Sequence, residues 1–247
     1  MSSFPDKPTR IGVVTSFDFH RDRELHRWVP DDAALRIART DAVSFSDNLE
    51  LVTSLNEPAC VRRPAREVLA EGADVVVFHC TACSFVGGHE RERALREALI
   101  SAGAPQALTT AGAMVDAMRA VGARKVAVAH PYEPPVGRKL GEYLTESGLE
   151  VVASTDLGLA SIREVYDVPS EQVAELARAA DRAGADALFV SCTALPTYDV
   201  IAPLERELGK PVVTANQATI WAALRAVGIA ARGPEQALVS RAAFGLP

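Results

Sequence analysis

Gly72-Ala-Asp-Val-Val-Val-Phe-His-Cys-Thr-Ala82 is repeated, with changes, as Gly184-Ala-Asp-Ala-Leu-Phe-Val-Ser-Cys-Thr-Ala194. The two stretches match at Gly, Ala, Asp, Cys, Thr and Ala, at a constant offset of 112 residues. In each, an apolar run follows a glycine turn and ends at Cys-Thr-Ala, which predicts a buried strand with a cysteine at its carboxyl end. The repetition predicts two similar units with a boundary near residues 112–122.

Further short apolar runs have the same character as these two strands. They lie at Ile11–Thr15, Lys125–Ala129 and Pro211–Thr214, and longer stretches rich in Ala, Arg, Glu and Leu separate them. Continuous apolar strands that alternate with helices are typical of a parallel sheet covered on both faces. The sequence therefore predicts an α/β fold.

Composition and charge limit the class of protein. The chain has 247 residues, 48% of them hydrophobic, and a net charge of −6. A chain of this size buries a substantial core, which excludes disorder and collagen-like repeats. Nucleic acid and anionic membrane surfaces are disfavoured as partners because both need a basic field. The first residues have no apolar leader and the apolar runs are short, so we expect a soluble, cytoplasmic protein with a small-molecule partner.

The chain contains four cysteines, at positions 60, 80, 83 and 192. In the reducing cytoplasm thiols stay unpaired, so we expect buried, metal-binding or catalytic cysteines rather than disulfides. Cys80 and Cys83 also form a C-x-x-C pair, which is typical of redox dithiols and of zinc half-sites. A zinc site needs two further ligands, and no second pair is present. We expect Cys83 to face the local core and Cys60 to be structural.

Cys80 and Cys192 each follow a predicted strand directly. Ligands of open α/β sheets bind outside the carboxyl ends of the strands. Backbone N–H groups of the following turn bind an anion there and lower the pKa of a thiol. If the two units face each other across a pseudo-two-fold axis, the thiols flank one substrate. This arrangement suits proton exchange on two faces of a carbon, or attack by one thiolate with protonation by the other thiol. The alternative is a pair of small buried side chains.

Three segments of the second unit, together with the paired Cys-Thr motifs, resemble a known family. They read Ser191-Cys-Thr-Ala-Leu-Pro-Thr-Tyr-Asp-Val-Ile201, Leu204-Glu-Arg-Glu-Leu-Gly-Lys-Pro-Val-Val213 and Asn216-Gln-Ala-Thr-Ile-Trp-Ala-Ala-Leu-Arg225. The chain resembles the maleate cis–trans isomerase and arylmalonate decarboxylase group of the aspartate/glutamate racemase superfamily. The resemblance covers nearly the whole chain and is strongest over residues 72–88 and 184–228.

The resemblance implies two Rossmann-like lobes with the active site in the cleft between them. The first lobe is expected at residues 1–116 and the second at residues 117–222. A helical segment at residues 223–247 is expected to pack back on the first lobe. The resemblance also implies a homodimer.

The resemblance further implies the roles of individual residues. Cys80 matches the thiolate that adds to the maleate double bond, and Cys192 matches the general acid. Backbone amides and side chains after each cysteine are expected to bind carboxylates, with a tyrosine from the second lobe; these residues are Thr81, Ala82, Thr193, Ala194 and Tyr132. In the decarboxylases a glycine replaces the first cysteine, so Cys80 disfavours that activity.

The segment after the first strand, Thr15-Ser-Phe-Asp-Phe-His-Arg21, departs from the isomerases, which have an asparagine there. Its candidate substrate-binding residues are Ser16 and Asp18. An anionic Asp18 repels a dicarboxylate but suits a substrate ammonium, or it positions a cysteine. The Phe-Asp-Phe pattern is closer to the ectoine-utilisation branch of the group. Arg21 either offers a guanidinium at the mouth of the site or lies in a solvated loop, which we favour. We expect Asn216 to cap the last helix.

These observations favour a cofactor-independent isomerase of a small carboxylate or dicarboxylate. No Walker loop or G-x-G-x-x-G motif is present, so no nucleotide cofactor is implied, and we expect neither a cofactor nor a metal. The main alternative is a racemase or epimerase with two cysteine bases. A decarboxylase, a C-x-x-C thiol oxidoreductase and a small-molecule binding module are weaker alternatives.

Overall fold

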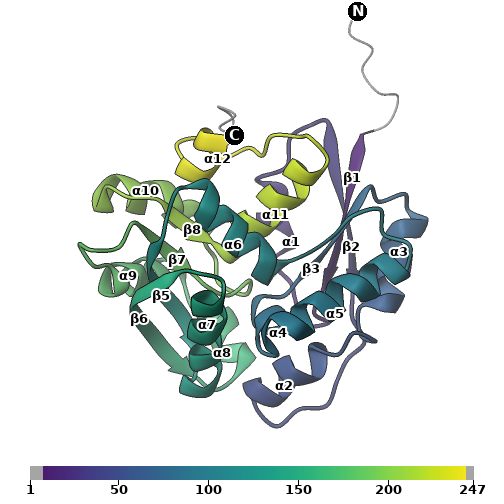
Figure 1. The fold of residues 1–247 in the computed structure, drawn as a ribbon, viewed down its shortest axis with the longest axis horizontal. Coiled ribbons are helices and arrows are strands. Elements are labelled where there is room, and N and C mark those ends of the chain that lie inside the picture. The colour runs from purple at the N-terminus through teal and green to yellow at the C-terminus, as the bar shows by residue number, and fades with distance from the viewer. Residues whose placement is uncertain (1–7, 243–247) are drawn as a thin grey trace, which may run out of the picture.

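The computed structural model describes residues 8–242, which contain two four-stranded parallel sheets (Figure 1). The first sheet has the order β2-β1-β3-β4, with β1 at Thr9–Thr15, β2 at Ala33–Arg39, β3 at Val75–His79 and β4 at Ala107–Thr109. The second has the order β6-β5-β7-β8, with β5 at Lys125–Tyr132, β6 at Glu150–Leu159, β7 at Ala187–Val190 and β8 at Val212–Thr214.

The two sheets repeat one topology, because each strand of the second corresponds to the strand four places earlier in the first. The repeated apolar stretches form β3 and β7, the inner strands that precede Cys80 and Cys192, and both strands are fully buried. Parallel pairing holds throughout, with β1 beside β3 and β5 beside β7. The predicted parallel α/β fold is confirmed.

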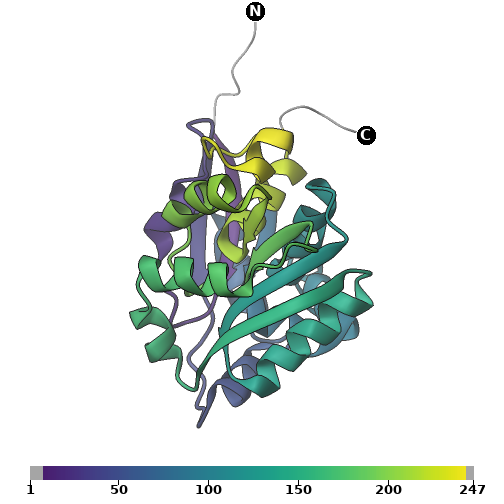
Figure 2. The same ribbon diagram turned by 90° about the vertical axis from the view of Figure 1, so that its left-hand side faces the viewer.

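Helices cover both faces of the sheets. Their bounds are α1 Asp22–His26, α2 Asn48–Leu55, α3 Arg62–Ala70, α4 Thr81–Phe85, α5 Gly88–Ser101, α6 Thr110–Ala120, α7 Pro134–Glu146, α8 Ile162–Asp167, α9 Ser170–Ala180, α10 Tyr198–Leu208, α11 Ala215–Ala226 and α12 Ala237–Ala242. In the second half, α9 and α10 lie on one side of the sheet and α7 on the other (Figure 2). Within residues 8–242, no helix combines the length and the apolar character that a membrane crossing requires.

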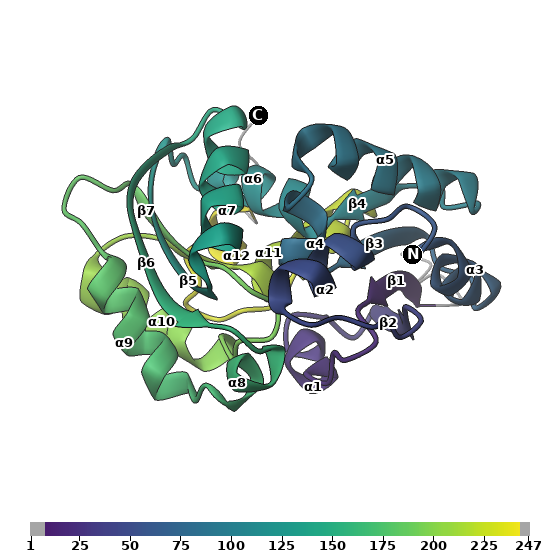
Figure 3. The ribbon, with the colours of Figure 1, turned by 90° about the horizontal axis from the view of Figure 1, so that it is seen from below.

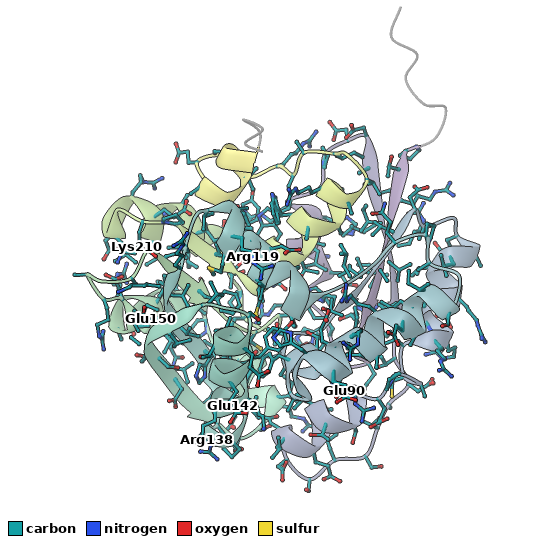
Figure 4. All side chains as sticks on the ribbon, viewed as in Figure 1. Glu90, Arg119, Arg138, Glu142, Glu150 and Lys210 are labelled. Atoms are coloured by element: carbon teal, nitrogen blue, oxygen red, sulfur yellow. A yellow bond between two sulfur atoms is a disulfide. The ribbon has the colours of Figure 1, made fainter. Side chains whose placement is uncertain are left out.

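The helix α7 shows how sequence spacing fixes the packing of such a helix. Its side chains at Val136, Leu140 and Leu144 are buried, at the four-residue spacing of one helix face. Arg138 and Glu142 lie on the opposite, exposed face (Figure 4). Pro134 starts the helix, where its missing N–H costs no hydrogen bond.

The helices α6 and α11 lie side by side between the two sheets (Figure 1). Thr219 Oγ1 of α11 donates to Thr110 Oγ1 of α6 at 3.0 Å. Although α11 follows the last strand of the second sheet, its Ile220 and Leu224 pack in one core cluster with Ile11 of the first sheet. A helix from the end of the chain therefore covers the sheet from its beginning.

The segment after α11 also contacts the first half. Arg232 N donates to Trp28 O at 2.7 Å, and Trp28 Nε1 donates to Gln236 Oε1 at 2.9 Å. The lobe bounds given above stay predictions. The expected boundary between residues 116 and 117 falls inside α6, and residues 1–7 and 243–247 of the expected segments lie outside the described residues.

Candidate active site

A cavity of about 50 Å³ lies between the two halves, at the carboxyl ends of the inner strands. It brings together all nine residues that the sequence singled out as site residues: Ser16, Asp18, Cys80, Thr81, Ala82, Tyr132, Cys192, Thr193 and Ala194. Seen from below, α1, α2 and α8 lie at the junction of the two halves (Figure 3). The catalytic and binding roles of these residues stay predictions.

Cys80 lies between β3 and α4 and is half-buried. It occupies the position before the first helical residue, in an extended conformation, so its side chain leaves the sheet toward the cavity. Thr81 and Ala82 begin α4, and the first N–H groups of a helix have no acceptor within the helix. The Thr81 hydroxyl is buried beside this turn and interacts with the Tyr132 side chain. This turn therefore offers several donors to a substrate oxygen.

Cys80 is joined to Cys83 by a disulfide bond. Their Cα atoms are 5.4 Å apart because one helical turn separates them. The expectation that all four cysteines are unpaired is therefore wrong for this pair, whereas Cys60 and Cys192 are free. Cys83 is 1% exposed and packs in the core cluster as predicted, but it also lines the cavity. In the described part of the chain no three His, Cys, Asp or Glu side chains are grouped as metal ligands.

Cys192 lies two residues after the end of β7 in a strained conformation, with φ of 109°, a region that non-glycine residues rarely adopt. Such strain is typical of functional sites. Burial raises the pKa of the Cys192 thiol to about 11, and the charge of Asp18 acts in the same direction, against hydrogen bonds from Ala194 N–H and Tyr132. The thiol therefore keeps its proton at neutral pH and can donate it.

Tyr132, at the end of β5, reaches the same part of the cavity. Its hydroxyl lies 3.1 Å from Ser191 Oγ, next to Cys192 in the chain. Burial and the charge of a Cys192 thiolate raise the pKa of Tyr132 well above its usual value. The phenol is therefore protonated and available as a hydrogen-bond donor.

The segment between β1 and α1 forms one wall of the cavity. Ser16 Oγ donates to the Asp18 carboxylate. The Arg21 guanidinium donates to Ala194 O and, at 2.7 Å, to Tyr166 O. The prediction of a solvated loop is wrong for Arg21, because these two carbonyls of the second half bind it in a half-buried position. Arg21 joins the two halves and is not free to bind a carboxylate.

Sequence reasoning missed the apolar wall of the cavity. This wall comes from α2 and α8, at Leu51, Val52, Leu55, Ile162, Val165 and Tyr166, and Phe19 and Val136 add to it. The spacing of Leu51, Val52 and Leu55 indicates one apolar helix face, which is equally typical of a core-facing helix. No signal in the sequence distinguished the two uses.

A buried network connects the residues next to both cysteines. Asn216 Nδ2 donates to Thr193 O at 3.1 Å, so its Oδ1 accepts from His79 Nε2 at 2.9 Å. The Thr15 hydroxyl donates to His79 O at 2.9 Å, and its oxygen lies 3.2 Å from His79 Nδ1. The predicted capping role of Asn216 is wrong, because the Thr214 side chain caps α11 and accepts from Gln217 N.

The burial of His79 predicts a loss of stability in mild acid. Burial lowers the pKa of His79 from 6.5 to about 4, against the hydrogen bond to Asn216. Between pH 6.5 and pH 4 only the unfolded chain binds this proton. The free energy of unfolding should therefore decrease as the pH is lowered through this range, by up to about 3 kcal/mol. Urea unfolding at several pH values checks this for wild type and His79→Gln. Profiles of equal slope in the two proteins would contradict the prediction.

A cysteine from each half at one cavity is typical of a two-lobed α/β enzyme with paired cysteines. A model of the arylmalonate decarboxylase family matches residues 57–239, and the chain belongs to this family. It is 34% identical over 170 residues to a maleate isomerase of Nocardia farcinica, covering 66% of this chain and 67% of the relative. It is 32% identical over 166 residues to the arylmalonate decarboxylase of Bordetella bronchiseptica, covering 66% and 69%.

Solved structures show the same fold. One is the maleate cis–trans isomerase of Nocardia farcinica, in a cysteine-to-serine variant with a covalently bound succinylcysteine intermediate. It superposes with a TM-score of 0.81 at 27% sequence identity, and the match covers 94% of this chain and 98% of that one. Another is a liganded variant of arylmalonate decarboxylase in which a glycine is replaced by cysteine and a cysteine by serine. It superposes with a TM-score of 0.82 at 27% sequence identity, and the match covers 94% of this chain and 99% of that one.

Proposed function

We propose that this protein is a cofactor-independent cis–trans isomerase of maleate or a closely related small carboxylate. The observation that carries the proposal is that Cys80 and Cys192, from equivalent strand ends, line one cavity. The covalent succinylcysteine intermediate of the Nocardia farcinica isomerase supports cysteine addition chemistry in this fold. Cys80 also disfavours decarboxylation, because the resemblance places a glycine at this position in the decarboxylases.

The reaction proceeds by reversible addition to the double bond. The Cys80 thiolate forms a C–S bond with one alkene carbon, and the Cys192 thiol gives its proton to the other. The former double bond is now single and rotates. The Cys192 thiolate then removes the proton again, the C–S bond breaks, and the trans isomer leaves with Cys80 restored as a thiolate. Atoms and charge balance without a cofactor.

The remaining site residues bind the substrate and orient it. The N–H groups at Thr81 and Ala82 offer donors to one carboxylate beside Cys80. Thr193, Ala194 and the protonated Tyr132 offer donors beside Cys192. Donors fixed before the substrate arrives hold it in a reactive position at little entropic cost.

Proton NMR with the purified, fully reduced protein tests the proposal. Maleate should be converted to fumarate without any added cofactor. The racemase alternative instead predicts that deuterium from solvent appears at Cα of an amino acid such as aspartate or glutamate. Deuterium exchange without fumarate formation would contradict the isomerase proposal and support the racemase alternative. The absence of both reactions would contradict both hypotheses.

Removing the charge of Asp18 should favour a dicarboxylate. Asp18 lines the cavity with a half-buried carboxylate, and one like charge at such a site opposes binding by about 1 kcal/mol. The Asp18→Asn variant should therefore raise kcat/KM for maleate by about fivefold to tenfold. Ser16→Ala is the matched control, because it removes the hydrogen bond to Asp18 and keeps the charge. A fall in kcat/KM would show that the carboxylate assists the reaction.

The homodimer is a further part of the proposal, supported by the resemblance alone. Light scattering of the purified protein checks it. A mass of one chain at assay concentrations would contradict it.

A further inference from the structure

The disulfide between Cys80 and Cys83 lies inside the site that the proposed function needs open. Cys80 is half-buried at the cavity, whereas Cys83 is 1% exposed. A Cα separation of 5.4 Å is ordinary for a disulfide. The backbone of α4 stays helical around the bond, with Ser84 N donating to Cys80 O at 3.2 Å. The bond therefore closes without unwinding the helix.

We propose that Cys83 is a resolving thiol, and that its reversible disulfide with Cys80 switches the enzyme off. The inference rests on the proposed function, in which Cys80 acts as a thiolate. A sulfur held in a disulfide has no thiolate to add to a double bond. The same bond protects Cys80 from irreversible oxidation to the sulfinic and sulfonic acids.

A hydroperoxide is the oxidant of the forward step. The Cys80 thiolate attacks the O–O bond and becomes a sulfenic acid, and the peroxide leaves as water after taking up one proton. The Cys83 thiol then condenses with the sulfenic acid, forming the S–S bond and releasing a second water. Overall, two thiols and one hydrogen peroxide give one disulfide and two waters, and the two electrons lost by sulfur reduce the peroxide.

A small-molecule thiol is the reductant of the reverse step. Its thiolate attacks the sulfur of Cys80, which faces the cavity, and the sulfur of Cys83 leaves as a thiolate and is protonated. A second small thiol then releases Cys80 and carries away the disulfide. Cys80 lines the cavity, so the attacking thiol reaches its sulfur from there.

The other two cysteines do not fit the resolving role. Cys192 shares the cavity but is free, and its raised pKa keeps it protonated and slow to oxidise. Cys60 donates its S–H to Ser54 O at 3.4 Å and burial raises its pKa as well. Cys83 is fixed next to Cys80, since Asn56 Nδ2 donates to Cys83 O at 2.5 Å.

Peroxide titration of the full chain tests the switch, with activity on maleate and a mass-spectrometric disulfide map as readouts. Each protein is compared with its own rate after full reduction. Wild type should lose at least about tenfold in rate as the Cys80–Cys83 disulfide appears, and dithiothreitol should restore the rate to within about twofold. Cys83→Ala should lose its rate and recover it only in part, because without a resolving thiol excess peroxide oxidises the sulfenic acid further, to sulfinic and sulfonic acids that dithiothreitol does not reduce. Cys60→Ala, the matched control, should behave as wild type.

Several results would overturn the inference. The first is an oxidised wild-type protein that contains the disulfide and still isomerises maleate at its reduced rate. The second is a disulfide map that lacks the Cys80–Cys83 bond after peroxide treatment. The third is a Cys83→Ala variant that regains its rate with dithiothreitol as fully as wild type does. Failure of the proposed function is recognised separately, since fully reduced wild type would then leave maleate unchanged. In that case the switch falls with it, and the map still decides whether Cys83 resolves oxidised Cys80.

Discussion

The Cys80→Ser variant should convert maleate on the order of 10³-fold or more slowly than reduced wild type. A serine hydroxyl is not ionised at neutral pH and is a far weaker nucleophile than a thiolate. The groups expected to bind carboxylates are unchanged, so KM should move only severalfold. Initial rates by proton NMR, measured in reducing buffer, check the expectation. Reduction is essential, because the disulfide to Cys83 would hide the effect.

Two controls make this result decisive. Cys60→Ser changes a cysteine that lies outside the cavity and should keep the wild-type rate. Thermal unfolding of Cys80→Ser should stay close to that of reduced wild type, because the half-buried side chain changes by one atom. Fumarate production that persists in a folded Cys80→Ser protein would remove Cys80 from the nucleophile role.

The Cys192→Ser variant should stop at a covalent adduct. Cys192 has a pKa of about 11 and so carries a proton that it can donate and later recover as a thiolate. A serine hydroxyl performs this exchange poorly, so turnover should fall on the order of 10³-fold. Intact-protein mass spectrometry after incubation with maleate should show an added mass of one maleate. Peptide mapping should place it on Cys80.

The double variant, with serine at both positions, is the control for the adduct. It keeps the cavity and the donors but has no thiolate at Cys80, so it should carry no added mass. An adduct of equal yield in the double variant would show that another nucleophile reacts. Full turnover in Cys192→Ser would show that another group supplies the proton.

The inner strands could be predicted from the sequence, and three outer strands could not. β3 and β7 are buried on both faces and form unbroken apolar runs. β2, β4 and β6 lie at sheet edges, where exposure mixes polar residues into the run, and β6 alternates between half-buried and exposed positions. An edge strand pairs on one side only and needs fewer apolar residues.

The sequence predicted the part of the candidate site that lies in the repeated motif. The duplicated motif predicted both cysteines and the residues after them, because equivalent strand ends meet at one cleft. The walls from α2 and α8 were not predictable, since an apolar helix face is the same signal whether it meets a core or a ligand. The C-x-x-C spacing allowed the Cys80–Cys83 bond, but spacing alone does not reveal the oxidation state.

The position of α11 limits how a substrate can enter. Because Ile220 and Leu224 of this helix are embedded against the first sheet, the halves cannot swing apart as rigid bodies on a hinge without breaking a shared core. Arg21 adds a second connection at the cavity itself. The helices α2 and α8, which line the cavity, lie outside this shared core, so they are less constrained than the two sheets.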